Sequence, residues 1–252
     1  MNLCLSLIVV LLHLTSTALV SAATDNNANI WLNYFGDHRL NDSPWSLHLD
    51  SQVRRADFGK NWQQFLIQPG VNYNLTDKIT TSAGYGYMET DRYGDFPIPF
   101  DLPEHRIWEQ ISIPTKLLGV TWQHRFRMEQ RFLGTPIASA PPVGAFGFRY
   151  ENRFRYRLQT FAPLDFLNLP NGYFRCYDEL FFNVGQDVAK NDFDQNRAYI
   201  GLGCSLGSHL GCEIGFMEQT LQHRDGVVWE NNHTLMISLT SKAIIKTRNR
   251  TQ

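Results

Sequence analysis

Charged and apolar residues alternate along several stretches of this 252-residue chain, and most of the charges are arginine or glutamate. In residues 146–158 the period is two, which is that of a β-strand, whose successive side chains point to opposite faces. Clustered guanidinium groups attract anions, and carboxylates beside them can form ion pairs. By this parity, the charges that share the polar face are Arg125, Arg127, Glu129, Arg131, Arg149, Glu151, Arg153, Arg155, Arg157, Glu179 and Arg197.

The other face of residues 146–158 is aromatic or aliphatic and is interrupted only by Asn152. Exposure to water does not account for the aromatic face of this strand, and burial in a protein core does not account for its charged face. Lipid on one side and a polar lumen on the other account for both faces, which is typical of a transmembrane β-barrel. An edge strand of a soluble sandwich explains one such stretch, but the pattern recurs. The strand-like segments are 45–54, 62–75, 79–88, 104–113, 118–132, 146–162, 174–184, 194–206, 210–219 and 232–240.

The connections between these segments alternate in length. Short turns at 76–78, 114–117 and 207–209 are separated by longer loops such as 220–231, although 163–173 is long for its place in the series. Outer-membrane barrels have short periplasmic turns and longer outer loops. We therefore expect an all-β fold, an antiparallel up-and-down transmembrane β-barrel of ten strands, or twelve, with both ends in the periplasm.

Four local features bear on this arrangement. Residues 30–40 also resemble a strand, but counting them gives eleven and leaves one terminus outside, so we expect an even number. Residues 146–162 exceed the roughly 9–11 residues that cross a bilayer, so this strand should project outward. Pro69 cannot donate to a ladder, which predicts a bulge. Glu109 shares the parity of apolar neighbours, and because a carboxylate facing lipid is costly, we expect a bulge there too.

The first 23 residues predict an export signal, because an apolar run at 5–14 precedes small residues at 20–23. No basic residue precedes that run, which leaves an uncleaved helix as an alternative. We expect a signal peptide at 1–23 and one barrel domain at 24–252 in the bacterial outer membrane. Its partners would then be outer-membrane lipid and the insertion machinery. A net charge of −1 argues against nucleic acid as a partner.

Several motifs extend this pattern: E-H-R-I-W-E-Q (104–110), H-R-F-R-M-E-Q-R-F (124–132), N-R-F-R-Y-R (152–157), Y-D-E-L-F-F-N (177–183) and F-D-Q-N-R-A-Y-I-G-L-G (193–203). With them the chain resembles, over nearly its whole length after the leader, a bacterial family of outer-membrane proteins defined only as a domain of unknown function. The resemblance implies an outer-membrane barrel and brings no established activity or catalytic residues.

The sequence offers little for catalysis. Cysteines and histidines are scattered, with no C-x-x-C pair and no phosphate-binding or dinucleotide motif, so we expect no metal and no cofactor. Some outer-membrane barrels modify lipids with His and Ser on the lipid-facing side. His105, Ser112, His124 and Asn152 could form such a group, but no serine lies in a distinctive motif, and we favour an interfacial role for His124.

The charged face therefore carries the functional hypothesis. We expect a non-enzymatic outer-membrane barrel with an arginine- and glutamate-lined lumen, which is either a structural, ion-paired plug or a narrow pore or pocket for small anionic solutes. The alternative is a lipid-modifying enzyme, a hydrolase or acyltransferase. A weaker alternative is a secreted lipocalin-like binding protein.

The spacing of two cysteines fixes the register of one hairpin. Cys204 and Cys212 flank the turn at 207–209, and pairing Leu206 with Leu210 places the two cysteines opposite each other. We expect an adjacent pair of thiols on the lipid side, with a disulfide as the less favoured state.

Overall fold

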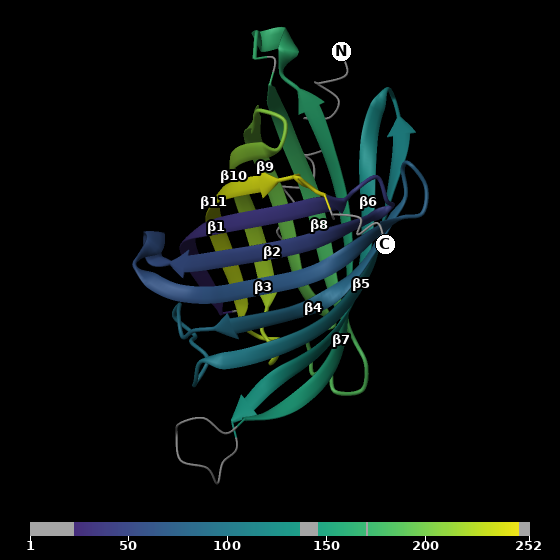
Figure 1. Cartoon of the computed structure of the whole chain (residues 1–252). Helices are drawn as coiled ribbons and strands as arrows, with labels where there is room; N and C mark the ends of the chain where they lie inside the picture. Colours follow the sequence, from purple (N-terminus) through teal and green to yellow (C-terminus); the bar gives the residue numbers. More distant parts are fainter. Residues whose placement is uncertain (1–22, 137–145, 170, 247–252) are drawn as a thin grey trace, which may run out of the picture.

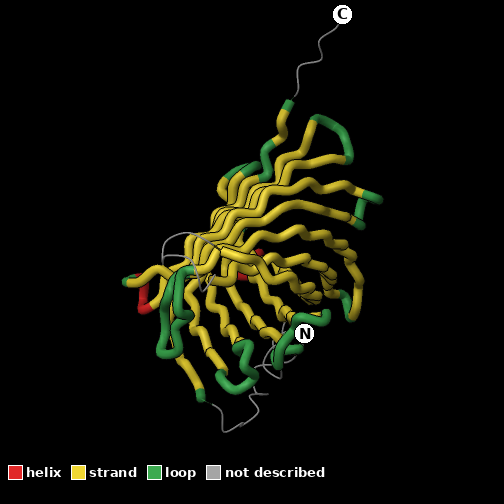
Figure 2. The backbone as a smooth tube through the Cα atoms, turned by 90° about the horizontal axis from the view of Figure 1, so that it is seen from below, coloured by secondary structure: helices red, strands yellow, loops and turns green. Residues whose placement is uncertain are grey.

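The computed structural model describes residues 23–136, 146–169 and 171–246. The predicted leader therefore lies almost wholly outside the described residues, as does the connection at 137–145. The described chain folds into one strongly curved sheet (Figures 1 and 2). Its strands are β1 (Thr24–Leu40), β2 (Trp45–Ala56), β3 (Asn61–Asn74), β4 (Thr80–Thr90), β5 (Leu102–Leu117), β6 (Val120–Pro136), β7 (Phe146–Pro163), β8 (Gly172–Val184), β9 (Phe193–Leu206), β10 (Leu210–Gln222), β11 (Trp229–Ser241) and the short β12 (Ile244–Ile245).

The sheet closes into a barrel of eleven long strands. Each strand from β1 to β11 pairs antiparallel with the next, and β1 then pairs with β11 in parallel, from Thr24 opposite Trp229 to Gly36 opposite Ser241. The expectation of an even strand number is therefore wrong. It required both ends of the wall to lie at the same mouth, whereas a parallel closing pair allows an odd count with the two ends apart. The ends of the wall consequently lie at opposite mouths.

The parallel seam between β1 and β11 is supported from inside the barrel by polar side chains. Asn29 donates from Nδ2 to Oδ1 of Asn232 at 2.7 Å, and Asn33 donates to Ser238 Oγ at 3.1 Å. These four residues are buried. Side-chain bonds of this kind add to the backbone ladder, which is slightly less stable per residue in parallel pairs.

The alternation of turn lengths is confirmed in the described chain, except at the short β2–β3 connection. One mouth, the short-turn rim, carries connections at 41–44, 75–79, 118–119 and 207–209, and also the longer one at 164–171, which holds the short helix η2 (Asp165–Leu167). The opposite mouth, the long-loop rim, carries 91–101, 185–192 and 223–228, and also the short connection at 57–60, which holds the helix η1 (Asp57–Gly59). The hairpin of β6 and β7 projects beyond the neighbouring strands there (Figure 1). It is formed by two of the longest strands, of 17 and 18 residues.

The wall has an apolar exterior and a polar interior. On β10, Ile214 and Phe216 are 53% and 47% exposed, whereas Glu213, between outward-facing neighbours, is only 4% exposed. The strand period of two thus sorts side chains in the direction opposite to that of a water-soluble sandwich. No helix in the described part of the chain is long and apolar enough to cross a membrane.

Neither predicted bulge is present. Pairing of β3 with β4 lapses at Gln68 and Pro69 and resumes in the same register, because a missing N–H removes a bond without adding a residue. Glu109 faces outward with an unbroken register on both sides, and its Oε1 accepts a hydrogen bond from Gln130 Nε2 at 3.0 Å. The register shifts lie elsewhere, at Arg54/Arg55 and at Phe181/Phe182.

The register predicted for the β9–β10 hairpin is confirmed. Cys204 lies opposite Cys212, and their Sγ atoms are 3.2 Å apart. Both thiols are free, as is that of Cys176.

Candidate functional site

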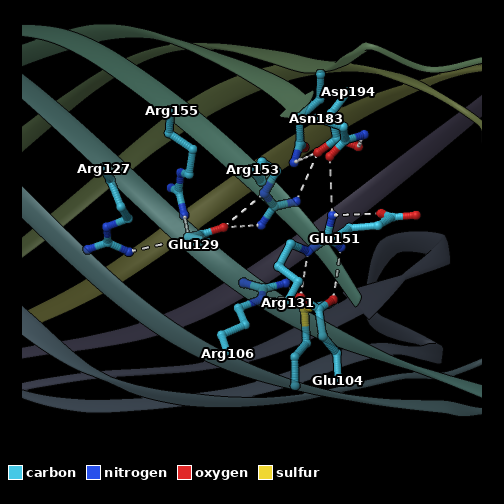
Figure 3. A network of polar contacts seen from close by, with 12 residues as sticks. Glu104, Arg106, Arg127, Glu129, Arg131, Glu151, Arg153, Arg155, Asn183 and Asp194 are labelled. Atoms are coloured by element: carbon cyan, nitrogen blue, oxygen red, sulfur yellow. Dashed lines mark hydrogen bonds and ion pairs between the residues drawn. The ribbon is translucent and has the colours of Figure 1, made fainter. Parts of the chain in front are cut away.

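The interior charges come from neighbouring strands of one side of the wall, chiefly β5 to β9. Pairing of β6 with β7 sets Arg127 opposite Arg155, Glu129 opposite Arg153 and Arg131 opposite Glu151. Because these residues share one parity, their side chains enter the lumen together. Figure 3 shows them converging.

Glu129 is the centre of this group and is fully buried. Its carboxylate lies 2.6 Å from Nη2 of Arg153, 2.6 Å from Nη1 of Arg155 and 3.8 Å from Nη1 of Arg127 (Figure 3). Burying a carboxylate is costly unless cations and hydrogen bonds replace its water. Three guanidinium groups perform that role here, so the carboxylate and its neighbours stabilise one another.

Two further carboxylates extend the group toward the long-loop rim. Glu104 receives two bonds from Arg131, at 2.7 Å from Nε and 3.0 Å from Nη2, and a third from Arg106. This bidentate geometry is the strong form of the arginine–carboxylate pair. Glu151 accepts from Arg149 at 2.7 Å and lies 4.0 Å from Arg131. Hydrogen bonds from Arg131 to Asn183, from Asn183 to Asp194 and from Arg153 to Asp194 join these pairs to the Glu129 group in one network.

Glu179 continues the network toward the short-turn rim, and Glu213 forms a separate ion pair nearer that rim. Glu179 lies 2.8 Å from Arg155 and 2.5 Å from Arg125. Glu213 lies 3.0 Å from Arg175, and it also accepts the hydroxyl of Tyr199 at 2.6 Å. Buried ion pairs therefore occur along much of the lumen.

The structure brings most of the predicted lumen charges together, with two exceptions. Arg157 and Arg197 are inside the barrel, but their Nε atoms have no hydrogen-bond partner among the described residues. Arg157 lies over the Tyr177 ring at 5.4 Å, and Arg197 over the Phe181 ring at 4.9 Å. Aromatic faces thus partly replace carboxylates as partners for these two cations.

The residue-type pattern missed several members of the site. Arg54 stands on the polar face of its segment in the sequence, so strand parity could have included it. Asp194 could not be found that way, because the bulge at Phe181/Phe182 buries Asp194 and Gln195 together and breaks the parity. The other members not anticipated are Glu104, Arg106 and Arg175.

A cavity of about 110 Å³ lies within the lumen near these charges. Six arginines line it, against two aspartates, Asp50 and Asp194. The arginines are Arg54, Arg106, Arg131, Arg153, Arg155 and Arg197. The lining therefore carries a surplus of positive charge.

The β4–β5 connection covers this cavity at the long-loop rim. Tyr93 also lines the cavity and donates its hydroxyl to Glu230 Oε1 at 2.8 Å, while the Asp95 N–H donates to Asp25 at 3.1 Å. Burial, together with the Glu230 carboxylate, raises the pKa of Tyr93 well above its usual value. The phenol consequently stays protonated and keeps its hydrogen bond across the mouth.

The residues considered for lipid chemistry do not assemble. His124 faces outward, held by Thr115 Oγ1 and Tyr156 OH, both at 2.8 Å. Ser112 has the opposite parity and belongs to the inner face, with Trp108. His105 instead bonds the hydroxyl of Tyr85 at 2.5 Å. Among the described residues, no three His, Cys, Asp or Glu side chains are grouped as a metal site requires.

Comparison with known proteins places this barrel in a family. Residues 28–231 match the family model described as Protein of unknown function (DUF2490). The chain belongs to this family. An uncharacterized protein of Methylorubrum extorquens is 25% identical over 233 residues, which cover 88% of this chain and 90% of that protein. No solved structure matches the chain.

Proposed function

We propose that this protein is a non-enzymatic barrel of the bacterial outer membrane whose lumen receives small anionic solutes without forming an open pore. One observation carries the proposal: an exposed apolar exterior surrounds a buried, ion-paired interior. That combination fits a wall between lipid and a polar lumen. It fits a secreted lipocalin-like binder poorly, because such a protein needs a polar exterior.

The outward-facing residues support membrane placement, because they change from apolar to polar along a strand. From the short-turn rim, the outward residues of β10 are apolar up to Phe216 and polar from Glu218 onward. The polar residues pair across strands: Glu218 with His233 at 2.7 Å, and Thr220 with Asn231 at 3.2 Å. An apolar band bounded by polar pairs matches a lipid-facing zone with an interfacial edge, which is about 25 Å tall in outer-membrane barrels.

The interior supports a closed lumen rather than an open channel. A conducting pore needs a continuous wet path, whereas the arginines and glutamates here bind one another across the lumen. The inner faces of β1, β9, β10 and β11 add bulky side chains, because Trp31, Tyr199, Met217 and Met236 form a buried cluster. We therefore propose that the lumen holds solute in a pocket and does not conduct steadily.

The localisation of the protein in the outer membrane is part of the same proposal. A leader at 1–23 would direct export, and the outer-membrane insertion machinery would assemble residues 24–252 in outer-membrane lipid. Fractionation of a Gram-negative host tests this. The protein should stay with outer membranes through salt and carbonate washes, dissolve only in detergent, and migrate differently on gels before and after heating. Release by salt would contradict membrane placement.

A matched pair of variants sharpens the test. Ile214→Arg puts a charge on the exposed apolar face and should reduce assembly, since such a change costs about 2–4 kcal/mol at the bilayer midplane. Ser208→Arg adds the same charge in the β9–β10 turn and should assemble normally. In planar bilayers, the wild-type protein should show no steady open channel. Stable conductance would contradict a closed lumen.

A further inference from the structure

We propose that the cavity between Arg54 and Arg197 binds one small, doubly charged oxyanion of the sulfate or phosphate class. This deepens the proposed function and rests on it only for how the anion reaches the cavity. Arg54 and Arg197 line this cavity, and neither forms an ion pair within the described chain.

Arg54 is buried, with 5% of its surface exposed. Its hydrogen bonds go to amide oxygens: Nε and Nη2 donate to Gln52 at 3.0 and 2.7 Å, and Nη1 donates to Gln64. Its guanidinium carbon lies 3.8 Å from the centre of the Trp31 ring. Within the described chain it forms no ion pair, and all its hydrogen bonds go to neutral groups.

Arg197 lies against the same indole. Its guanidinium carbon is 5.2 Å from the centre of the Trp31 ring, and its Nε has no partner among the described residues. Two cations that share one aromatic neighbour repel each other, and the repulsion is strong where little water screens it. An anion between them would convert this repulsion into two ion pairs.

A third group at the cavity also lacks an acceptor. Gln68 is 2% exposed and lines the cavity, and its Nε2 has no partner in the described structure. Its Oε1 lies 3.5 Å from Arg127 Nη1, which assigns the amide nitrogen as the unsatisfied end. Buried polar groups are nearly always bonded. The unsatisfied groups here, on Gln68 and Arg197, are both N–H donors, so what they need is an acceptor.

The size of the cavity limits the ligand. At about 110 Å³ it is well below the roughly 300–1,000 Å³ of pockets for drug-sized molecules, yet it has room for several waters. This volume is suited to a single tetrahedral oxyanion. The other arginines of the lining, Arg106, Arg131, Arg153 and Arg155, are fixed by Glu104, Glu129 and Glu179, which keeps the wall rigid.

Calorimetric titration of the full protein in detergent micelles with sodium sulfate, and separately with sodium phosphate, tests the proposal. The wild-type protein should bind one anion per chain. Arg54→Gln and Arg197→Gln should each weaken binding at least tenfold. Arg157→Gln is the matched control, because Arg157 is another lumen arginine with an unpartnered Nε but does not line the cavity. It should bind within about twofold of wild type.

A variant that adds a carboxylate to the cavity tests the proposal even if an arginine variant fails to fold. Gln68→Glu supplies a carboxylate from the protein itself, so sulfate binding should be lost while the melting temperature is kept or raised. The proposal is overturned if wild type binds neither anion saturably, if Gln68→Glu binds like wild type, or if Arg157→Gln loses as much as Arg54→Gln. Anion binding in micelles does not depend on where the protein is located in the cell. The fractionation test can therefore fail while sulfate still binds, and the protein can fractionate with the membrane while sulfate does not bind.

Discussion

Glu129 and Arg153 are direct cross-strand partners, and the bond between them, 2.6 Å long, is buried inside the barrel. Glu129→Gln would keep the shape of this side chain and remove its charge, leaving Arg153 and Arg155 with one carboxylate fewer. We expect the free energy of unfolding to fall by about 3–5 kcal/mol, the usual cost of breaking a buried pair. Urea titration of the folded protein in micelles measures it.

The control for that variant is Glu218→Gln on the outer face. Glu218 pairs with His233 at 2.7 Å, but His233 is half exposed, so the change should cost less than about 1 kcal/mol. Equal losses in the two variants would show that the inner network does not stabilise the barrel more than surface pairs do.

The hairpin thiols provide a covalent test of register. Because Cys204 and Cys212 are opposite one another with Sγ atoms 3.2 Å apart, a mild oxidant should join them without unfolding the protein. Peptide mapping of unreduced protein would identify the bond. Cys176→Ser should still form it, whereas Cys204→Ser should not. A bond that instead includes Cys176 would contradict the β9–β10 register.

The seam between β1 and β11 should depend on one inward asparagine. Asn232 accepts from Asn29 at 2.7 Å and donates to Glu230 at 2.6 Å. Asn232→Ala removes the acceptor of the buried Asn29 amide and one donor to Glu230, and should cost about 1–3 kcal/mol of unfolding free energy. Asn231→Ala, one position away on the outer face, is the matched control and should cost less than about 1 kcal/mol. Heat-modified mobility on gels measures the loss of the folded barrel in both variants.

A histidine at the long-loop rim predicts a pH effect. His223 lies 3.1 Å from the Glu230 carboxylate, and this hydrogen bond raises the pKa of His223 above its usual value of about 6.5. The contribution to stability is therefore complete below the unfolded pKa and is lost as pH rises through the folded pKa. It should amount to about 1 kcal/mol or less.

Unfolding midpoints of wild type and His223→Gln should thus differ more at about pH 5.5 than at about pH 8.5. His209→Gln, which changes an exposed histidine in the β9–β10 turn, serves as the control. A difference between wild type and His223→Gln that grows as pH rises would contradict the assigned sign.

Strand parity in the sequence predicted the sorting of side chains well, because in a barrel wall every alternate residue meets a different environment. The inward-facing residues from Arg149 to Arg157 could be predicted from this one strand, without knowing which strands lie beside it. The hairpin with Cys204 and Cys212 was predictable because a three-residue turn fixes the register locally.

Features that depend on distant partners were not predictable in this way. Whether β1 joins β11, and in which direction, is set by the closure of the whole sheet. Asp194 faces the lumen because of a β-bulge, and no local sequence pattern predicts that bulge. Glu109 remains outward because Gln130, from the next strand, satisfies one of its oxygens. The cavity itself needs Arg54 from β2 and Arg197 from β9, which only the closed barrel brings together.

The parallel seam also has a consequence for how the chain folds. It joins residues as far apart as Thr24 and Trp229, so the last contacts of the barrel require almost the entire polypeptide. Contacts of such long range form slowly, and until they form, β1 and β11 are open sheet edges that can pair with other chains. A chain that stops before β11 could form every hairpin up to β10 and still not close the barrel. The seam therefore makes completion of the polypeptide a condition for a closed, aggregation-resistant molecule.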